Sequence, residues 1–365
     1  SDPMHPDGPN APHHRGFDRF YGTIHGAGSF FAPASLTRDG KDASADFEKD
    51  PAYYYTDAIS DNALAYLREH EKKAADKPYF LYMAYTAAHW PLHARDSDIA
   101  KYKGKYAMGW DELRKQRHAR MKELGVVDPA WGLSPRHPDV PAWDEAEHKE
   151  WQQRRMEVYA AQVTVMDEGI GRVVNHLKKS GNFENTMILY MHDNGGCHVE
   201  YGASRKGPYL PEKTRDGKPM VPGNLPDHMP GPEYTYQSYG YGWANASNTP
   251  FRLFKQHDHE GGTRSPLIVS WPQQISGGKE PGVQPGSLHD RVCHAIDLMP
   301  TFMEAAGVVW PGANAGGRQP RRMEGRSFFP ALTAAANPSP PLDAIFWAHA
   351  KGKAVRKGQW LSLIH

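Results

Sequence analysis

Residues 187–196 read Met-Ile-Leu-Tyr-Met-His-Asp-Asn-Gly-Gly, and this stretch decides the fold class. The apolar run Met187–Met191 is short and is followed by turn residues, which is typical of a buried strand. Asp193 and Asn194 then place a carboxylate and an amide oxygen where open α/β sheets carry their chemistry, at the carboxyl end of a strand. Such oxygens are ligands that Ca²⁺ or Mg²⁺ accepts. The same residues also make an ordinary turn, and the pattern alone leaves both interpretations open.

Helical and strand patterns alternate around this stretch. We expect a helix over Thr56–Ala75, with Thr56 as its N-cap, and a long helix over about Asp144–Lys179 that Gly181 ends. The apolar run Tyr79–Tyr85 between them predicts another buried strand. This order predicts an α/β fold with a mostly parallel sheet flanked by helices. The predicted apolar face of the long helix comprises Met156, Tyr159, Val163, Met166, Ile170, Val173 and Leu177.

Other segments are less regular. Residues 5–50 are rich in Gly, Pro and aromatics, and we expect irregular structure that covers a sheet edge. Residues 202–250 predict a long loop whose tyrosines and Trp243 form either an aromatic binding surface or a packed surface loop. A short helix is predicted over Asp297–Ala306, capped by Asp297. Strand fragments are predicted at 346–348 and 353–364.

Composition excludes several classes of protein. The chain has 365 residues, a formal net charge of +1 and no basic stripe, so nucleic acid is not an expected partner. No run approaches the roughly 18 apolar residues of a membrane span. Two cysteines, Cys197 and Cys293, cannot build a disulfide framework, and we expect free thiols.

Three further motifs accompany the Asp-Asn-Gly-Gly stretch. They are residues 87–93 (Ala-Ala-His-Trp-Pro-Leu-His), residues 250–255 (Pro-Phe-Arg-Leu-Phe-Lys) leading to Glu-Gly-Gly at 260–262, and residues 294–301 (His-Ala-Ile-Asp-Leu-Met-Pro-Thr). In this order and at these separations, the set resembles the type I sulfatases of the alkaline phosphatase superfamily, especially bacterial arylsulfatases. The resemblance runs from about Arg15 to the last residues.

The resemblance implies roles for four residues. Asp193 and Asn194 would be ligands of a Ca²⁺ ion, His89 would contact the sulfate and act as general acid to the leaving group, and Lys255 would bind the sulfuryl oxygens. Each role suits its residue type, since His titrates near neutral pH and Lys is a compact cation. Without the resemblance, His89 is a loop histidine satisfied by its neighbours and Lys255 a solvated charge. The implied substrate is a sulfate ester of a small molecule or a glycan.

Departures from the family pattern matter as much as the matches. Type I sulfatases make a formylglycine nucleophile from the Cys or Ser of a C-x-P-x-R motif, and neither Cys197 nor Cys293 lies in one. The family's opening strand, with its paired aspartates, is also not recognised. We therefore expect a sulfatase piece truncated at both ends, with a sulfatase-like domain over residues 5–335 and the start of a carboxy-terminal subdomain at 336–365.

These departures lead to three hypotheses about function. The first is a sulfuric ester hydrolase of the arylsulfatase type whose calcium site is incomplete and which is inactive by itself. The second is a phosphonate or phosphate ester hydrolase of the same superfamily, and the third is a non-catalytic scaffold or binding module. Loss of a strand beside Thr186–Met191 and Leu267–Trp271 leaves three outcomes open: the neighbouring strands slide together, residues 5–50 cover the gap, or a second copy pairs with the edge. Of these we predict a homodimer through the exposed sheet edge. The compartment is not predicted, because no signal-peptide pattern is seen although family members are often periplasmic or secreted.

Overall fold

The computed structural model describes residues 7–275, 283–310, 323–333, 341–349 and 352–364. Two compact units divide the chain, and each gathers segments that are distant in sequence. The first unit comprises residues 1–118, 133–179 and 196–250, and the second comprises residues 119–132, 180–195 and 251–365. The predicted domain boundary at 335/336 lies outside the described residues and stays a prediction.

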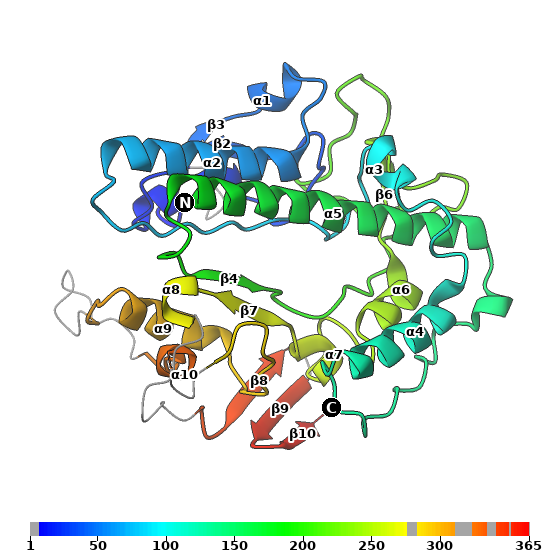
Figure 1. The fold of residues 1–365 in the computed structure, drawn as a ribbon. Coiled ribbons are helices and arrows are strands. Elements are labelled where there is room, and N and C mark those ends of the chain that lie inside the picture. Colours follow the sequence, from blue (N-terminus) through cyan, green and yellow to red (C-terminus); the bar gives the residue numbers. More distant parts are fainter. Residues whose placement is uncertain (1–6, 276–282, 311–322, 334–340, 350–351, 365) are drawn as a thin grey trace. The chain divides into compact units, whose positions relative to one another are not determined.

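Two long helices run side by side in the first unit (Figure 1). They are α2 (Tyr55–Lys73) and α5 (Lys149–Ser180), and both were predicted. The N-cap prediction was wrong: the extended Tyr54 precedes α2, and the Tyr55 amide donates to the carbonyl of Phe30 at 2.7 Å. This tertiary contact takes the place of a side-chain cap. Helix α5 begins later than predicted, since a 3₁₀ turn over Trp143–Glu145 precedes it and His148 has a φ of 52°.

Polar contacts join α2 to α5. Arg172 of α5 forms ion pairs with Asp57 and Asp61 of α2. Nε2 of His176 lies 3.0 Å from Oε1 of Glu71. Small residues also allow the close approach, because a Cβ on Gly169 would lie 2.2 Å from Ser60 Oγ. The predicted apolar face of α5 was partly wrong. Val163 is 36% exposed, whereas Val158, Ala161 and Val165 are buried.

The amino-terminal region of the first unit forms a small antiparallel sheet instead of purely irregular structure. Its strands are β1 (Tyr21–Thr23), β2 (Leu36–Arg38) and β3 (Lys41–Asp42), in the order β1-β2-β3. Leu36 joins Tyr53, Tyr55 and Ile59 in a buried cluster, so this sheet is attached to the start of α2. The remaining short elements are η1 (Pro12–His14), α1 (Ala45–Glu48), α3 (Asp96–Ala100) and α4 (Gly109–Glu123).

The apolar run 79–85 does not form the predicted buried strand. Its backbone has no assigned strand, and Phe80 and Tyr82 are 60% and 71% exposed. Tyr85 is half-buried against α2, where its hydroxyl lies 2.7 Å from Ser60 Oγ. A strand forms only where a neighbour shares backbone hydrogen bonds, and apolar composition does not specify that neighbour.

Residues 202–250 contain more structure than the predicted loop. They include β5 (Val221–Pro222), β6 (Thr235–Tyr236) and α6 (Gly240–Ser247). Tyr236 and Trp243 are fully buried, and Tyr239 is 5% exposed. The segment thus contributes aromatic side chains to the core of the first unit, and the predicted aromatic surface is reduced to the half-buried Tyr209, Tyr234 and Tyr241.

The second unit contains two small sheets. Strands β4 (Ile188–Met191) and β7 (Leu267–Ser270) pair antiparallel, with Ile188 opposite Ser270. Strands β8 (Ile345–His349), β9 (Gly352–Lys357) and β10 (Trp360–Ile364) form an antiparallel meander. The helices of the second unit are α7 (Glu260–Thr263), α8 (Pro272–Ile275), η3 (Ala295–Asp297), α9 (Leu298–Ala305) and α10 (Phe329–Leu332).

The predicted mostly parallel sheet is not found within the described ranges. There, β5 and β6 are the one pair of parallel strands, and the pairing of β4 with β7 is antiparallel. The reason is that a short apolar run indicates burial, while the direction of its neighbour depends on distant parts of the chain.

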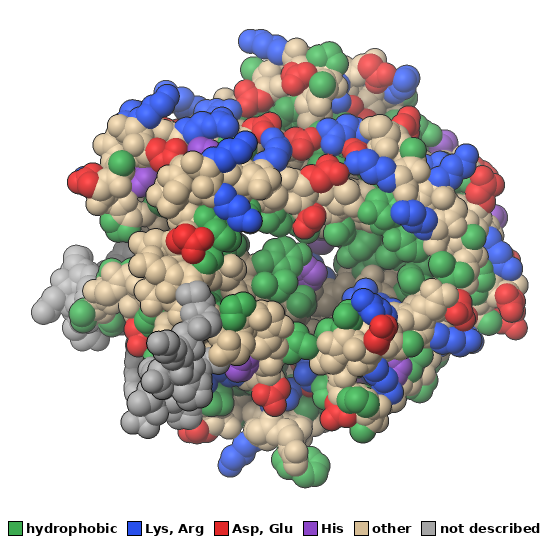
Figure 2. Space-filling model, in the orientation of Figure 1, with side chains coloured by type: hydrophobic (Ala, Val, Ile, Leu, Met, Phe, Trp, Pro, Cys, Tyr) green, Lys and Arg blue, Asp and Glu red, His purple; other side chains and the backbone are tan. Residues whose placement is uncertain are grey.

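Charges of both signs are interspersed on the face shown in Figure 2. Among the described residues, ion pairs join Arg19 to Glu69 and Lys101 to Asp98. None of the helices in the described part of the chain has the length and apolar character needed to cross a bilayer.

Candidate active site

The four predicted site residues are divided between the two units. His89 lies in the first unit, and Asp193, Asn194 and Lys255 lie in the second. The geometry of each group is given separately.

His89 lies in a turn that fixes its ring. Its amide donates to the carbonyl of Thr86, and its Nδ1 lies 2.9 Å from the carbonyl oxygen of Trp90. Because a carbonyl oxygen can only accept, Nδ1 carries the proton in this contact. The ring is half-buried, and Nδ1 is engaged with the backbone.

The residues after His89 anchor this turn to the core. The Leu92 amide donates to the carbonyl of Gln237 at 2.9 Å, and the Ala94 amide donates to that of Gly231 at 3.1 Å. The Tyr54 hydroxyl donates to the carbonyl of His93 at 2.8 Å. The position of His89 thus depends on segments from both α2 and the region around β6.

His93 is a buried histidine to which sequence reasoning assigned no role. Its side chain is fully buried, Nε2 donates to the carbonyl of Thr235 at 2.6 Å, and the amide of Phe30 donates to Nδ1 at 3.3 Å. Burial lowers the pKa of His93 to about 4, so the ring is neutral at physiological pH. In the sequence, the feature that marks His93 as buried is its place among the apolar residues of the motif at 87–93.

Aromatic rings surround the neighbour of His89. The Trp90 ring lies 5.1 Å from that of Tyr201 and 5.9 Å from that of Tyr209, measured between centroids. The Arg205 guanidinium lies over the Tyr201 ring at 5.1 Å. Trp90 Nε1 is buried and has no hydrogen-bond partner among the described residues. This cluster offers ring surfaces and an orphaned donor beside the candidate general acid.

Asp193 and Asn194 follow β4 directly. Asp193 is exposed and Asn194 is half-buried. Asn194 Nδ2 donates to the carbonyl of Gly195, so its Oδ1 is the atom that a cation would take. The Gly195 amide donates to the carbonyl of Gly262 at 2.9 Å, and this bond ties the loop to the segment that carries Lys255.

The backbone around Lys255 is strained. Leu253 and Gln256 have φ values of 67° and 76°, in the left-handed region that non-glycine residues rarely adopt. Phe254, between them, is fully buried and anchors the turn. Such strain is concentrated at functional sites, where the surrounding structure maintains it. The half-buried Lys255 therefore lies on a strained turn that Phe254 anchors.

Gly261 and Gly262 make this turn possible. A Cβ on Gly261 would lie 2.2 Å from the carbonyl oxygen of Leu253, and one on Gly262 would lie 2.1 Å from that of His257. Any side chain at either position would push the Lys255 segment away. The glycines serve the close packing of the backbone, as their structural interpretation predicted.

The described residues of this loop do not complete a calcium site. Asp193 and Asn194 offer one carboxylate and one amide oxygen, whereas Ca²⁺ takes 6–8 oxygen ligands. Within the ranges that the structure describes, three residues of the His, Cys, Asp and Glu types converge only at Asp7, His13 and His14. Both Cys197 and Cys293 are free, as predicted.

Comparison with known proteins identifies the family. The family model described as Sulfatase matches residues 4–308. The chain belongs to the sulfatase family. An uncharacterized sulfatase of Schizosaccharomyces pombe is 30% identical over an alignment of 376 positions, which covers 96% of this chain and 63% of that protein. An arylsulfatase of Klebsiella aerogenes is 28% identical over 319 residues, which cover 81% of this chain and 62% of that protein.

A solved structure supports the fold. The crystal structure of Ps i-CgsB superposes with a TM-score of 0.56 at 23% identity, covering 97% of this chain and 59% of that one. The chain thus has the α/β fold of sulfatases in the alkaline phosphatase superfamily. It spans less than two thirds of the length of each of these three proteins.

Proposed function

We propose that this chain carries the leaving-group acid and sulfate-binding residues of a sulfuric ester hydrolase. The match of the sulfatase family model to residues 4–308 is the observation that carries the proposal. In this proposal His89 contacts the sulfate and protonates the leaving oxygen, and Lys255 neutralises charge on the sulfuryl oxygens.

The local geometry supports the role of His89. In this proposal Nδ1 stays engaged with the carbonyl of Trp90, and Nε2 of the protonated ring donates the proton to the leaving oxygen. The backbone anchors at Leu92 and Ala94 would limit movement of the ring, which a general acid requires.

The second-unit residues support a role in binding an anion. Lys255, Asp193 and Asn194 lie on two loops joined by the hydrogen bond from Gly195 to Gly262. We propose that Asp193 and Asn194 are part of the ligand set of a calcium ion, whose other ligands are not among the residues described around them. A bound Ca²⁺ would supply positive charge to the sulfate ester.

The proposed substrate is a sulfate ester attached to a ring. Similarity to the Klebsiella aerogenes arylsulfatase favours an aryl ring. Ps i-CgsB is also known in complex with k-i-k-neocarrahexaose, which favours a sugar ring. Aromatic side chains stack on either kind of ring; the half-buried Trp90 lies beside His89, and the half-buried Tyr209 lies beside Trp90.

The nucleophile gives a direct test. The 365 residues contain no Cys or Ser in a C-x-P-x-R pattern, so we expect no turnover of para-nitrophenyl sulfate by the chain alone. Loss of a nucleophile that acts with other groups costs several orders of magnitude in rate. Turnover that His89→Ala abolishes and His289→Ala preserves would contradict this expectation and indicate a different nucleophile.

A leaving-group series tests the acid role of His89. The series is measured on the chain expressed together with a segment that carries a C-x-P-x-R motif. We expect His89→Ala to lower kcat by about 10²–10⁴-fold for para-cresyl sulfate and by less for para-nitrophenyl sulfate, whose phenolate leaves without a proton. Equal losses on both substrates would contradict the acid role. The exposed His289, changed to Ala, is the matched control.

A further inference from the structure

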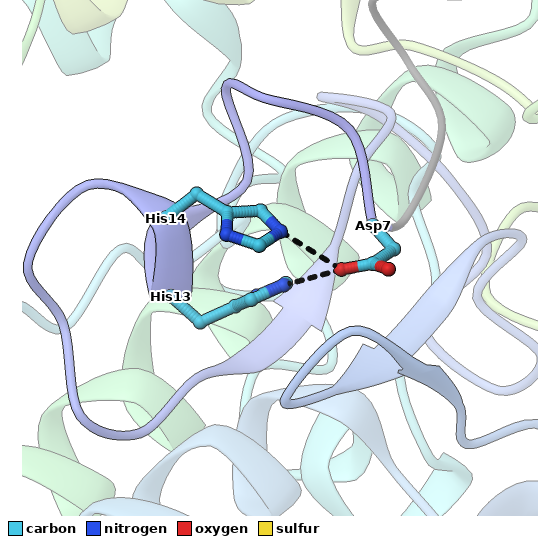
Figure 3. Close-up of side chains that lie close together, drawn as sticks. All are labelled: Asp7, His13 and His14. Atoms are coloured by element: carbon cyan, nitrogen blue, oxygen red, sulfur yellow. Dashed lines mark hydrogen bonds and ion pairs between the residues drawn. The ribbon is translucent and has the colours of Figure 1, made fainter.

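We propose that Asp7, His13 and His14 form a binding site for a divalent transition-metal ion on the first unit. Figure 3 shows the two imidazole rings converging on the carboxylate of Asp7. Asp7 Oδ1 lies 2.8 Å from His13 Nε2 and 3.0 Å from His14 Nε2. The three ligand atoms all lie within 4.8 Å of one another.

The spacing fits ligands of one metal ion. Two neighbouring ligands at about 2.1 Å from a metal are separated by roughly 3.0 Å in octahedral geometry and roughly 3.4 Å in tetrahedral geometry. The distances from Asp7 Oδ1 to His13 Nε2 and to His14 Nε2 are close to the separation of neighbouring ligands in octahedral geometry. The ligand nitrogens of the two histidines lie within 4.8 Å of each other, and rotation of the imidazoles would bring them to the spacing of two ligands.

The ligand types select the class of metal. Two imidazole nitrogens and one carboxylate suit Zn²⁺, Ni²⁺, Co²⁺ or Cu²⁺, whereas Ca²⁺ and Mg²⁺ take oxygen ligands. The Asp7 and His14 side chains are 60% and 47% exposed, so water can complete the coordination. This chemistry differs from that of the oxygen ligands Asp193 and Asn194, and the site does not rest on the proposed function.

Local structure brings the three side chains together. The 3₁₀ turn η1 (Pro12–His14) has Pro12 at its start, which presets the backbone angle. The amide of Ala11 donates to the carbonyl of Gly8 at 2.9 Å, and this turn folds Asp7 back toward the histidines.

Gly40 provides the space behind the site. Its φ is 79°, in the turn between β2 and β3, and a Cβ there would lie 2.7 Å from His13 Cε1 and 3.3 Å from Asp7 Oδ1. The glycine therefore accommodates the His13 ring in its present position. A metal at this site would link the segment 7–14 into one rigid turn next to the small sheet.

The rival interpretation is a trio joined only by hydrogen bonds. In that state both imidazoles donate to Asp7, and these bonds hold its pKa below the usual range. Metal binding through Nε2 moves the His13 proton to Nδ1, which is buried without a hydrogen-bond partner among the described residues. Metal-ligating histidines usually donate this proton to an acceptor. We therefore expect micromolar affinity, below that of a structural zinc site.

Zinc titration of the full 365-residue chain tests the site. Calorimetry with ZnCl₂ should show one ion bound with a Kd on the order of micromolar, and Co²⁺ should give visible absorption bands from the same site. We expect Asp7→Asn, His13→Gln and His14→Gln each to weaken binding by at least about 10-fold.

Matched variants separate this site from other histidines. Gly40→Ala should also weaken zinc binding, because it displaces His13 without removing a ligand. His289→Gln, at an exposed position, should leave the affinity unchanged. Absence of micromolar binding, or binding of the same strength in the double variant His13→Gln/His14→Gln, overturns the proposal. Far-UV circular dichroism of each variant confirms that it is folded.

Discussion

At the scale of single residues, His93 shows how burial disfavours the charged form of a histidine. It is fully buried, bonded to the carbonyl of Thr235, and its pKa is lowered to about 4. In the unfolded chain the pKa of a histidine is about 6.5. Between these two values the unfolded chain binds a proton that the folded chain does not, so acid favours unfolding.

We therefore predict that His93 makes stability depend on pH between about 6.5 and 4. Its contribution is fully present above pH 6.5 and is lost as the pH falls, by up to about 3 kcal/mol. Urea unfolding at several pH values measures it. His93→Gln, which keeps a donor for Thr235, should flatten the pH dependence, and His289→Gln should not. Parallel curves for wild type and His93→Gln would disprove this role.

A second prediction concerns calcium at Asp193. One carboxylate and one amide oxygen set a low affinity, since calcium sites gain affinity from several carboxylates. We expect no micromolar Ca²⁺ binding by the chain in calorimetry. If such binding occurs, and Asp193→Ala abolishes it while Asp7→Ala does not, then other residues of this chain complete the site.

The sequence identified candidate site residues unevenly. His89, Asp193, Asn194 and Lys255 stood out through motif order, and the strained turn at Lys255 is the kind of local feature expected at a site. The trio of Asp7, His13 and His14 was passed over. Adjacent histidines were visible at 13–14, but the approach of Asp7 depends on a turn that composition does not reveal.

At the scale of elements, two glycines of α5 give contrasting predictions. A Cβ on Gly169 would lie 2.2 Å from Ser60 Oγ and 3.1 Å from Tyr85 Oη, whereas one on Gly171 would meet nothing within 4 Å. We expect Gly169→Ala to lower the free energy of unfolding by about 2 kcal/mol through overpacking. Gly171→Ala should raise it by about 0.5–1 kcal/mol, because alanine favours the helix.

Urea denaturation of both variants is the measurement, and each is the control for the other. Gly169→Ala should also disturb the hydrogen bond between Ser60 and Tyr85, and Ser60→Ala should relieve part of the clash. Equal effects of the two glycine substitutions would show that α5 does not pack on α2 as closely as described.

Helices were easier to predict than strands. The positions of α2 and α5 follow from periodicity and from Gly181, whose φ is 79°. Strands β4 and β7 were both recognised, but their direct antiparallel pairing was not, and the run 79–85 forms no strand. Helical hydrogen bonds are local, whereas the hydrogen bonds of a strand come from segments far away in the sequence.

At the scale of the whole molecule, the sheet formed by β4 and β7 is small and leaves its edges open. It has two strands, and no other strand in the described part of the chain pairs with either. Ile268 of β7 is 59% exposed, and Met191 of β4 is 36% exposed. Two-stranded sheets are marginally stable in water, and their open edges are templates for pairing with another chain.

We therefore predict that the chain associates with a second copy through β4 and β7. A symmetric dimer is the commonest closed arrangement, and it would cover the apolar face as well as one open edge. Light scattering at tens of micromolar should show a dimer, and hydrogen exchange should show slower exchange at Thr186–Met191 and Leu267–Trp271 on association.

A charge placed on the sheet tests where the copies meet. Ile268→Lys should shift the dimer toward monomer, because association would bury the lysine, whereas Ile296→Lys, at a 39% exposed position outside the sheet, should not. A wild-type chain that stays monomeric at these concentrations rules out the association. A dimer that Ile268→Lys leaves intact, with no added protection of the two strands, is held together by a different surface.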